Sequence, residues 1–281
     1  MVGASFRREH RDASVLMAIV ATILVSAALA SYMNFSLAGS DRTLVAQMLG
    51  AQLYFSPVSA GVIITGMAAA EVYFVSRLER AGKVAESVVL MSVAVTAGLV
   101  TLAFAKGFVD AFFSNSGVVV LFVMSLGVFL TLFLTFLVLI GEYSDLVKNL
   151  LLVVFSSTMG AFFSLVFPTL QLLILVLTMM VLDLALTYSQ ARQEYRGEPS
   201  KLAFTTRDWG VGLGDLIVYT MITGKALLAY GLFPFVLSVA LLIVGVGAAV
   251  RLTRRSELRF IPGVLLGGGF ASLPLLFLSI T

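Results

Sequence analysis

The chain has 281 residues, of which 60% are hydrophobic and 12% charged, and its mean hydropathy is +1.06. A soluble protein of this length needs far more polar surface to cover its core, so the composition indicates an integral membrane protein. The lack of cysteine excludes disulfides, thiol nucleophiles and thiolate-bound metals. A single histidine leaves little scope for zinc chemistry or a Ser-His-Asp triad, so we expect neither a metal nor a cofactor.

Apolar segments long enough to cross a bilayer recur along the whole chain. Since a spanning helix needs about 20 apolar residues, the sequence predicts nine helices, at 15–37, 57–76, 84–105, 117–140, 149–166, 169–188, 211–230, 232–250 and 260–280. The Phe167-Pro168 pair predicts a tight turn between the fifth and sixth. The predicted fold is an all-α polytopic membrane protein. It forms one structural unit, in which 1–166 holds helices one to five as a scaffold and 167–281 holds helices six to nine.

Basic residues are distributed unevenly between the two sides of this arrangement. Fifteen of the 18 Lys and Arg residues fall on the side of the N-terminus, mainly in the loops 77–83, 189–210 and 251–259. By the positive-inside rule the N-terminus is cytoplasmic and the C-terminus lies outside. The net charge of +3 therefore reflects membrane orientation, and we expect a lipid bilayer and no nucleic acid as partner.

Two aspartates stand apart from the other acidic residues because they lie inside predicted helices. Asp183 is about five residues from the inner end of the sixth helix, and Asp215 is about five residues from the inner start of the seventh. At 1.5 Å per residue, both lie roughly 7 Å below the cytoplasmic surface. Charged groups at such depth cost about 2.5–3.5 kcal/mol on insertion scales, so a matched pair indicates a function.

A pair of neighbouring carboxyl groups is suited to aspartyl proteolysis. Two close carboxylates cannot both ionise cheaply, so the pair shares a proton. The ionised partner takes a proton from the attacking water, and the protonated partner polarises the peptide carbonyl. The sequence leaves open which aspartate has which role.

The residues around Asp215 carry a family resemblance. Gly212-Leu213-Gly214-Asp215, followed by Tyr219, resembles the GxGD signature of presenilins and signal peptide peptidases, whose partner aspartate lies in the preceding helix, as Asp183 does here. The resemblance implies an intramembrane aspartyl endopeptidase. The predicted helix number and orientation are similar to presenilin, and the short loop between helices six and seven is most similar to archaeal homologues.

Two elements depart from the family pattern. The Tyr-Asp of its sixth helix is Leu182-Asp183 here, and its Pro-Ala-Leu element, packed near the catalytic pair in the ninth helix, corresponds to Ala271-Ser272-Leu273-Pro274. These two stretches, with Gly212, Leu213, Gly214 and Tyr219, are the predicted supporting residues of the active site. Tyr219 lies one helical turn after Asp215, where it either bonds the pair or packs with its hydroxyl satisfied elsewhere.

A substrate helix must be unwound before its peptide bonds can be cut. Addition of the unwound segment as a strand to exposed backbone is the expected means of holding it, and the candidate edges are 203–211 and 256–262. Expected substrates are single-span membrane proteins or signal peptides. No partner subunit is implied, a homo-oligomer is left open, and the expected location is the cell membrane of a prokaryote.

Three alternatives remain at this point. A prepilin-type peptidase also uses a GxGD aspartate, but its second aspartate need not be buried as deeply as Asp183. A proton or cation transporter or channel would use the two aspartates for ions, although they lie near one surface and no internal repeat is evident. A scaffold without chemistry would keep its function after both were exchanged for asparagine.

Overall fold

The computed structural model describes 16–32, 34, 100, 118–119, 121–123, 125–127, 129, 133, 145–192, 203–206, 209–255 and 263–280. The predicted spans 57–76, 84–105 and 117–140 lie wholly or largely outside these residues, as does the candidate edge 256–262. Three helices of the described part are long and apolar enough to cross a membrane: Asn149–Val166, Leu213–Tyr230 and Leu232–Leu252.

The described elements follow the predicted order closely from residue 145 onward. They are α6 (Asp145–Val166), α7 (Thr169–Arg192), β1 (Ala203–Thr206), β2 (Trp209–Gly212), α8 (Leu213–Tyr230), α9 (Leu232–Arg255), the π-helical turn η2 (Val264–Gly268) and α10 (Gly269–Ile280). The predicted turn at Phe167-Pro168 is confirmed, since α6 ends and α7 begins on either side of it. Within 15–37, the segment Leu16–Tyr32 is helical.

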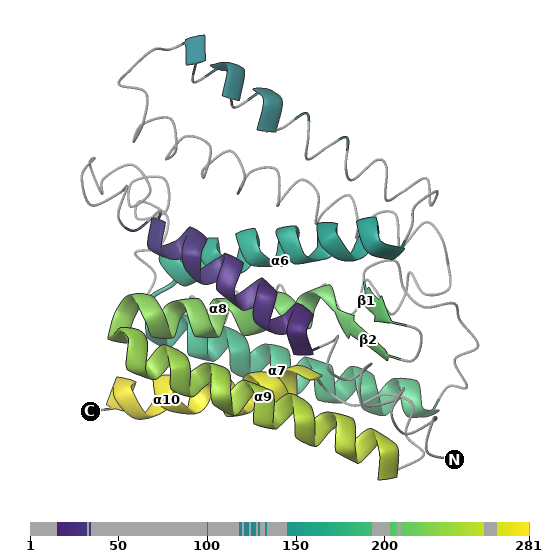
Figure 1. The fold of residues 1–281 in the computed structure, drawn as a ribbon. Coiled ribbons are helices and arrows are strands. Elements are labelled where there is room, and N and C mark those ends of the chain that lie inside the picture. Colours follow the sequence, from purple (N-terminus) through teal and green to yellow (C-terminus); the bar gives the residue numbers. More distant parts are fainter. Residues whose placement is uncertain are drawn as a thin grey trace.

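The purely helical fold class needs one correction. β1 and β2 form an antiparallel hairpin in which Ala203 pairs with Gly212 and Thr206 with Trp209. Val211 and Gly212 therefore belong to a strand, and the seventh predicted helix begins two residues later than expected. The candidate edge 203–211 falls on this hairpin. β-branched and aromatic residues favour the pleated conformation here, and β2 passes into α8 without a loop (Figure 1).

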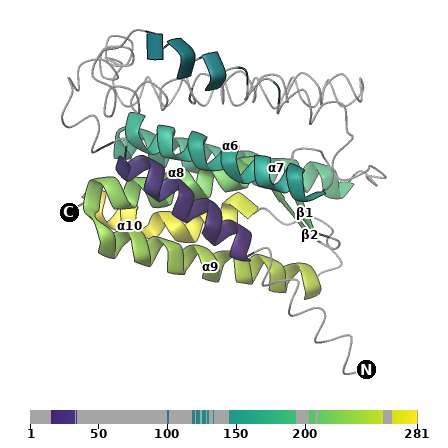
Figure 2. The ribbon, with the colours of Figure 1, turned by 45° about the horizontal axis from the view of Figure 1, so that its top comes forward.

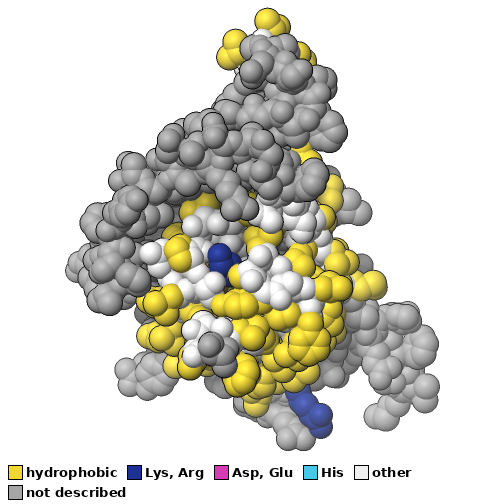
Figure 3. All heavy atoms as spheres, turned by 90° about the vertical axis from the view of Figure 1, so that its left-hand side faces the viewer, with side chains coloured by type: hydrophobic (Ala, Val, Ile, Leu, Met, Phe, Trp, Pro, Cys, Tyr) yellow, Lys and Arg dark blue, Asp and Glu magenta, His cyan; other side chains and the backbone are white. Residues whose placement is uncertain are grey.

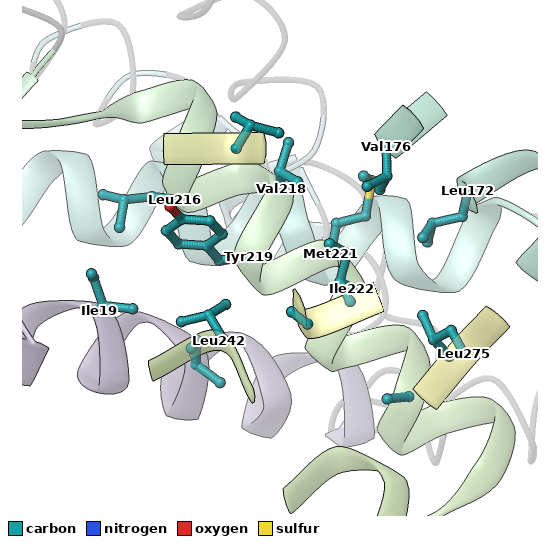
Figure 4. Close-up of a cluster of buried hydrophobic side chains, with 14 of the residues drawn as sticks. Ile19, Leu172, Val176, Leu216, Val218, Tyr219, Met221, Ile222, Leu242 and Leu275 are labelled. Carbon is teal, nitrogen blue, oxygen red and sulfur yellow. The ribbon is translucent and has the colours of Figure 1, made fainter. Parts of the chain in front are cut away.

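α8 occupies the centre of the described bundle, with α6 on one side and α9 on the other (Figures 1 and 2). From Leu216 onward, its buried apolar residues form one core with side chains from the segment Leu16–Tyr32 and from α7, α9 and α10 (Figure 4). The members labelled in that view include Ile19, Leu172, Leu216, Ile222, Leu242 and Leu275.

Small residues let the central helices approach closely. A Cβ added at Gly160 of α6 would overlap the Thr220 side chain of α8, and one at Gly224 would lie 2.9 Å from the Ser164 hydroxyl. A Cβ at Gly245 of α9 would overlap the Leu266 carbonyl of η2. Small residues at helix contacts are typical of membrane proteins, where close van der Waals packing replaces the hydrophobic effect.

Candidate active site

Asp215 lies where the hairpin turns into α8. Gly212 ends β2 and is the N-cap of α8, with an extended backbone (φ −64°, ψ 148°). Asp215 falls in the first turn of the helix and accepts a backbone hydrogen bond from Gly212. A carboxylate three residues after the N-cap that bonds the N-cap N–H is one half of a capping box, and its charge suits the positive end of the helix. The GxGD stretch is therefore a strand-to-helix junction that fixes one carboxylate.

Asp183 lies on α7 and bonds a different element. Its Oδ2 accepts the backbone N–H of Val264 at 2.9 Å and that of Leu265 at 3.3 Å. These N–H groups belong to the first two residues of η2, and N–H groups in the first turn of a helix are typically satisfied by acceptors outside it. Asp183 thus caps the last helix of the chain from a neighbouring helix.

Tyr219 connects α8 to the same turn. Its side chain is 2% exposed, and its hydroxyl donates to the Gly263 carbonyl at 2.8 Å. The bond to Gly263 corresponds to the second of the two roles considered, in which the hydroxyl is satisfied elsewhere. Both aspartates lie close enough to this hydroxyl to interact with it electrostatically.

The backbone at Gly263 lies directly against the second carboxylate. A Cβ added there would be 2.7 Å from Asp215 Oδ2 and 3.4 Å from the Tyr219 hydroxyl oxygen. A Cβ at Gly267 would be 2.5 Å from that hydroxyl. Since the next two residues bond Asp183, a single turn lies against both carboxyl groups, which are near enough to influence each other electrostatically. The structure therefore brings together Asp183, Asp215 and Tyr219.

The predicted residues adjoining Asp215 have distinct positions. Leu213 is buried among Leu152 and Phe155 of α6, which anchors the start of α8. Gly214 is exposed, with open space where a side chain would be, so the backbone beside Asp215 is accessible. Leu182 precedes Asp183 on α7, and its side chain lies outside the described residues.

The stretch Ala271-Ser272-Leu273-Pro274 lies inside α10, beyond the turn that the aspartates contact. Ala271, Ser272 and Pro274 are buried, whereas Leu273 is exposed. Asp183 bonds Val264, which is eight residues before Ser272 and thus roughly two helical turns away from this stretch. A pocket role for 271–274 stays a prediction.

Two features were missed from the sequence. The first is Gly263 to Leu265, for which the Pro262-Gly263 pair at the start of the last span was the available signal. The second is Lys225, a half-buried cation within α8 whose Nζ donates to the Ser164 carbonyl at 3.3 Å, near the end of α6. A single basic residue inside an apolar span would have revealed it.

The end of the bundle opposite the hairpin has a different surface. Its coloured side chains are mainly hydrophobic, with basic side chains near the centre and at the lower edge and no acidic side chain in view (Figure 3). Within the residues that the structure describes, no three His, Cys, Asp or Glu side chains are placed to hold a metal ion.

Comparison with known proteins gives a match by structure only. No family model matches the sequence, and a search of curated proteins finds no match. A solved structure, that of a presenilin-family intramembrane aspartate protease, superposes with a TM-score of 0.61. The match covers 95% of this chain and 99% of that one, at 16% sequence identity. The resemblance seen around Asp215 is thus confirmed at the level of the fold, which over 95% of the chain is that of a presenilin-family intramembrane aspartate protease.

Proposed function

We propose that this protein is an intramembrane aspartyl endopeptidase that hydrolyses peptide bonds of transmembrane-helix substrates. The observation that carries the proposal is the convergence of Asp183 and Asp215, from two separate helices, on the single turn Gly263 to Leu265. An isolated acidic residue at a helix terminus has an ordinary capping role. Two that meet at one turn, within a fold shared with an aspartate protease, have the arrangement needed for a carboxyl pair.

The chemistry follows from a shared proton. One aspartate, ionised, removes a proton from a water molecule as the water attacks the peptide carbonyl. The other, protonated, donates to the carbonyl oxygen, so no charged intermediate has to form in an apolar environment. Collapse of the hydrated carbonyl then releases the amine, which takes up a proton from the pair.

The hairpin is the proposed holder for the unwound substrate. It is a two-stranded sheet in the described residues, so each strand keeps one edge without a sheet partner, and β2 leads directly to Asp215. Strand addition would supply main-chain hydrogen bonds to a peptide that has lost its own helical ones. Proline replacement at successive positions of 203–211 should impair cleavage in an alternating pattern; a flat response would contradict strand addition.

The proposal includes the finer topology predicted from the sequence. The chain crosses the membrane nine times with a cytoplasmic N-terminus and an outer C-terminus, and the expected location is a prokaryotic cell membrane. Water then reaches the pair from the cytoplasmic side. Substrates are single-span proteins or signal peptides, and no partner subunit or self-cleavage step is included.

The decisive experiment is cleavage of a single-span substrate by purified protein in bicelles. Fragments from the wild type that disappear in Asp183→Ala and in Asp215→Ala, with helix content and thermal unfolding preserved, would establish the two-aspartate mechanism. Persistence of cleavage in either variant would refute it. Ion flux in liposomes, measured on the same preparations, covers the transporter alternative.

A further inference from the structure

The two carboxyl groups differ in their hydrogen bonds. Asp183 Oδ2 accepts two backbone N–H groups, from Val264 and Leu265, at 2.9 and 3.3 Å. Hydrogen bonds donated to a carboxylate favour its charged form, and so does the positive end of a helix. Asp183 therefore has two fixed donors, neither of which titrates.

Asp215 has fewer such donors. Among the described residues it accepts one backbone hydrogen bond, from Gly212, and its Oδ2 lies beside Gly263 at the place where a Cβ would stand. The nearby Tyr219 hydroxyl does not add a donor because its proton goes to the Gly263 carbonyl. Both aspartates lie at a helix N-terminus, so the helix dipole does not distinguish them. The number of backbone N–H donors in the described residues distinguishes them, with two at Asp183 and one at Asp215.

We infer that Asp183 is the ionised partner and acts as general base, while Asp215 carries the shared proton and acts as general acid. This assignment rests on the proposed function and deepens it. The turn at Val264 and Leu265 is then a positioning element, since it acts through Asp183 and need not touch the substrate.

The reaction balances with this assignment. Asp183 takes a proton from water as the water oxygen bonds to the carbonyl carbon, and Asp215 gives its proton to the carbonyl oxygen. In the collapse, the carbon–nitrogen bond breaks, the proton on Asp183 passes to the leaving nitrogen, and one hydroxyl of the hydrated carbonyl returns a proton to Asp215. The products are an amine and a carboxylic acid, and the pair is restored to its starting state.

Infrared spectroscopy of protein with isotope-labelled aspartate carboxyl groups tests the assignment without requiring proteolysis. At mildly acidic pH, the wild type should show one protonated aspartate in excess of the exposed ones. Asp215→Asn should abolish that band, and Asp183→Asn should retain it. Any other pattern overturns the assignment, even if the protein proves to be a protease. The expected pattern in a protein without cleavage would uphold the proton location and refute the proposed function alone.

A backbone substitution provides a second test. Val264→Pro removes one N–H donor to Asp183 at the first residue of η2. Because Gly263 before it has helical backbone angles, which proline disfavours in the preceding residue, helix content and thermal unfolding are measured alongside the rate. Val264→Ala trims the same side chain and keeps the N–H. The acidic limb of the pH profile of kcat/KM should move to higher pH in the proline variant and stay in place in the alanine variant. Identical profiles would show that the bond does not hold Asp183 ionised and would overturn the assignment.

Discussion

Two faces of α8 carry polar side chains in an apolar environment, and the hydrogen bonds of these side chains are satisfied in different ways on the two faces. On the face toward α6, the Thr220 hydroxyl bonds the Leu216 carbonyl of its own helix and also the Ser156 carbonyl of α6. On the face toward η2, the Tyr219 hydroxyl donates to the Gly263 carbonyl, and the next residue, Val264, donates its N–H to Asp183 of α7. On the first face, loss of the Thr220 hydroxyl would disturb only the contact between α6 and α8. On the second face, one turn joins three elements, because it accepts the Tyr219 hydroxyl of α8 and donates to Asp183 of α7, whereas the Thr220 contact joins α6 and α8.

Outside the two aspartates, the largest expected effect is at Gly263. In Gly263→Ala, the new Cβ would meet Asp215 Oδ2 at 2.7 Å, so the carboxylate or the turn must move. A displacement of about 1 Å in a reacting group can lower the rate roughly 100-fold, and we expect a loss of that order in cleavage with little change in thermal unfolding.

The matched control for Gly263 is Gly247→Ala, because a Cβ at Gly247 has open space around it. This variant should keep both rate and stability. If Gly263→Ala cleaved as fast as Gly247→Ala, the turn Gly263 to Leu265 would have no role in placing the carboxylates. The contrast between the two faces of α8 would then disappear.

The α6 contact should show the opposite pattern. Gly160→Ala places a methyl group on the Thr220 side chain, and overpacking of this kind costs about 1–3 kcal/mol. The melting temperature should fall while cleavage per folded molecule is kept. The double variant with Thr220→Ala should be more stable than the two single effects predict. A purely additive result would show that the two residues do not meet.

A smaller effect is expected for Tyr219→Phe. The substitution keeps the ring and removes the hydrogen bond from the Tyr219 hydroxyl to the Gly263 carbonyl, a contribution of about 0.5–1.5 kcal/mol for a typical bond. The turn should loosen, so kcat should fall several-fold more than KM rises. Assays at fixed enzyme concentration in bicelles, with Tyr230→Phe on the same helix as control, would measure this; an unchanged kcat would show that the hydroxyl only fills space.

The smallest effect is expected for Lys225→Met. The lysine interacts with the C-terminal turn of α6 through the Ser164 carbonyl, an interaction of about 0.3–1 kcal/mol. Methionine keeps the apolar stem and also avoids placing a charge within a span. Stability should therefore change by less than about 1 kcal/mol, as measured by thermal unfolding, and cleavage should not change. A large loss of cleavage would show that α6 and the carboxyl pair are coupled.

Much of the helical framework could be predicted from the sequence because apolar length and helix breakers are local properties. The break at Phe167-Pro168 and the ends at Val166, Tyr230 and Ile280 needed no tertiary information. Asp215 and Asp183 could also be found, since a carboxylate inside an apolar span is conspicuous wherever the helix packs.

The contacts of those carboxylates could not be predicted in the same way. That Gly263 lies against Asp215 depends on how the last helix docks on α8, which is decided by close contacts such as Gly267 with Tyr219 and Gly245 with Leu266. Which segment of the last helix lies beside the aspartates, Gly263 to Leu265 or 271–274, is decided by proximity in the fold and not by any local sequence pattern. The hairpin was foreseen as exposed backbone only, since four-residue strands carry little periodic signal.

The direct passage of β2 into α8 has a consequence for where a substrate would be cut. With no loop between Gly212 and Leu213, a peptide paired with β2 would be aligned on the same rigid piece that carries Asp215. The junction would then fix the number of substrate residues between the last position paired with β2 and the cleaved bond. Lengthening the connection between β1 and β2 would leave the cut in place, whereas inserting a residue between Gly212 and Asp215 would shift it along the substrate.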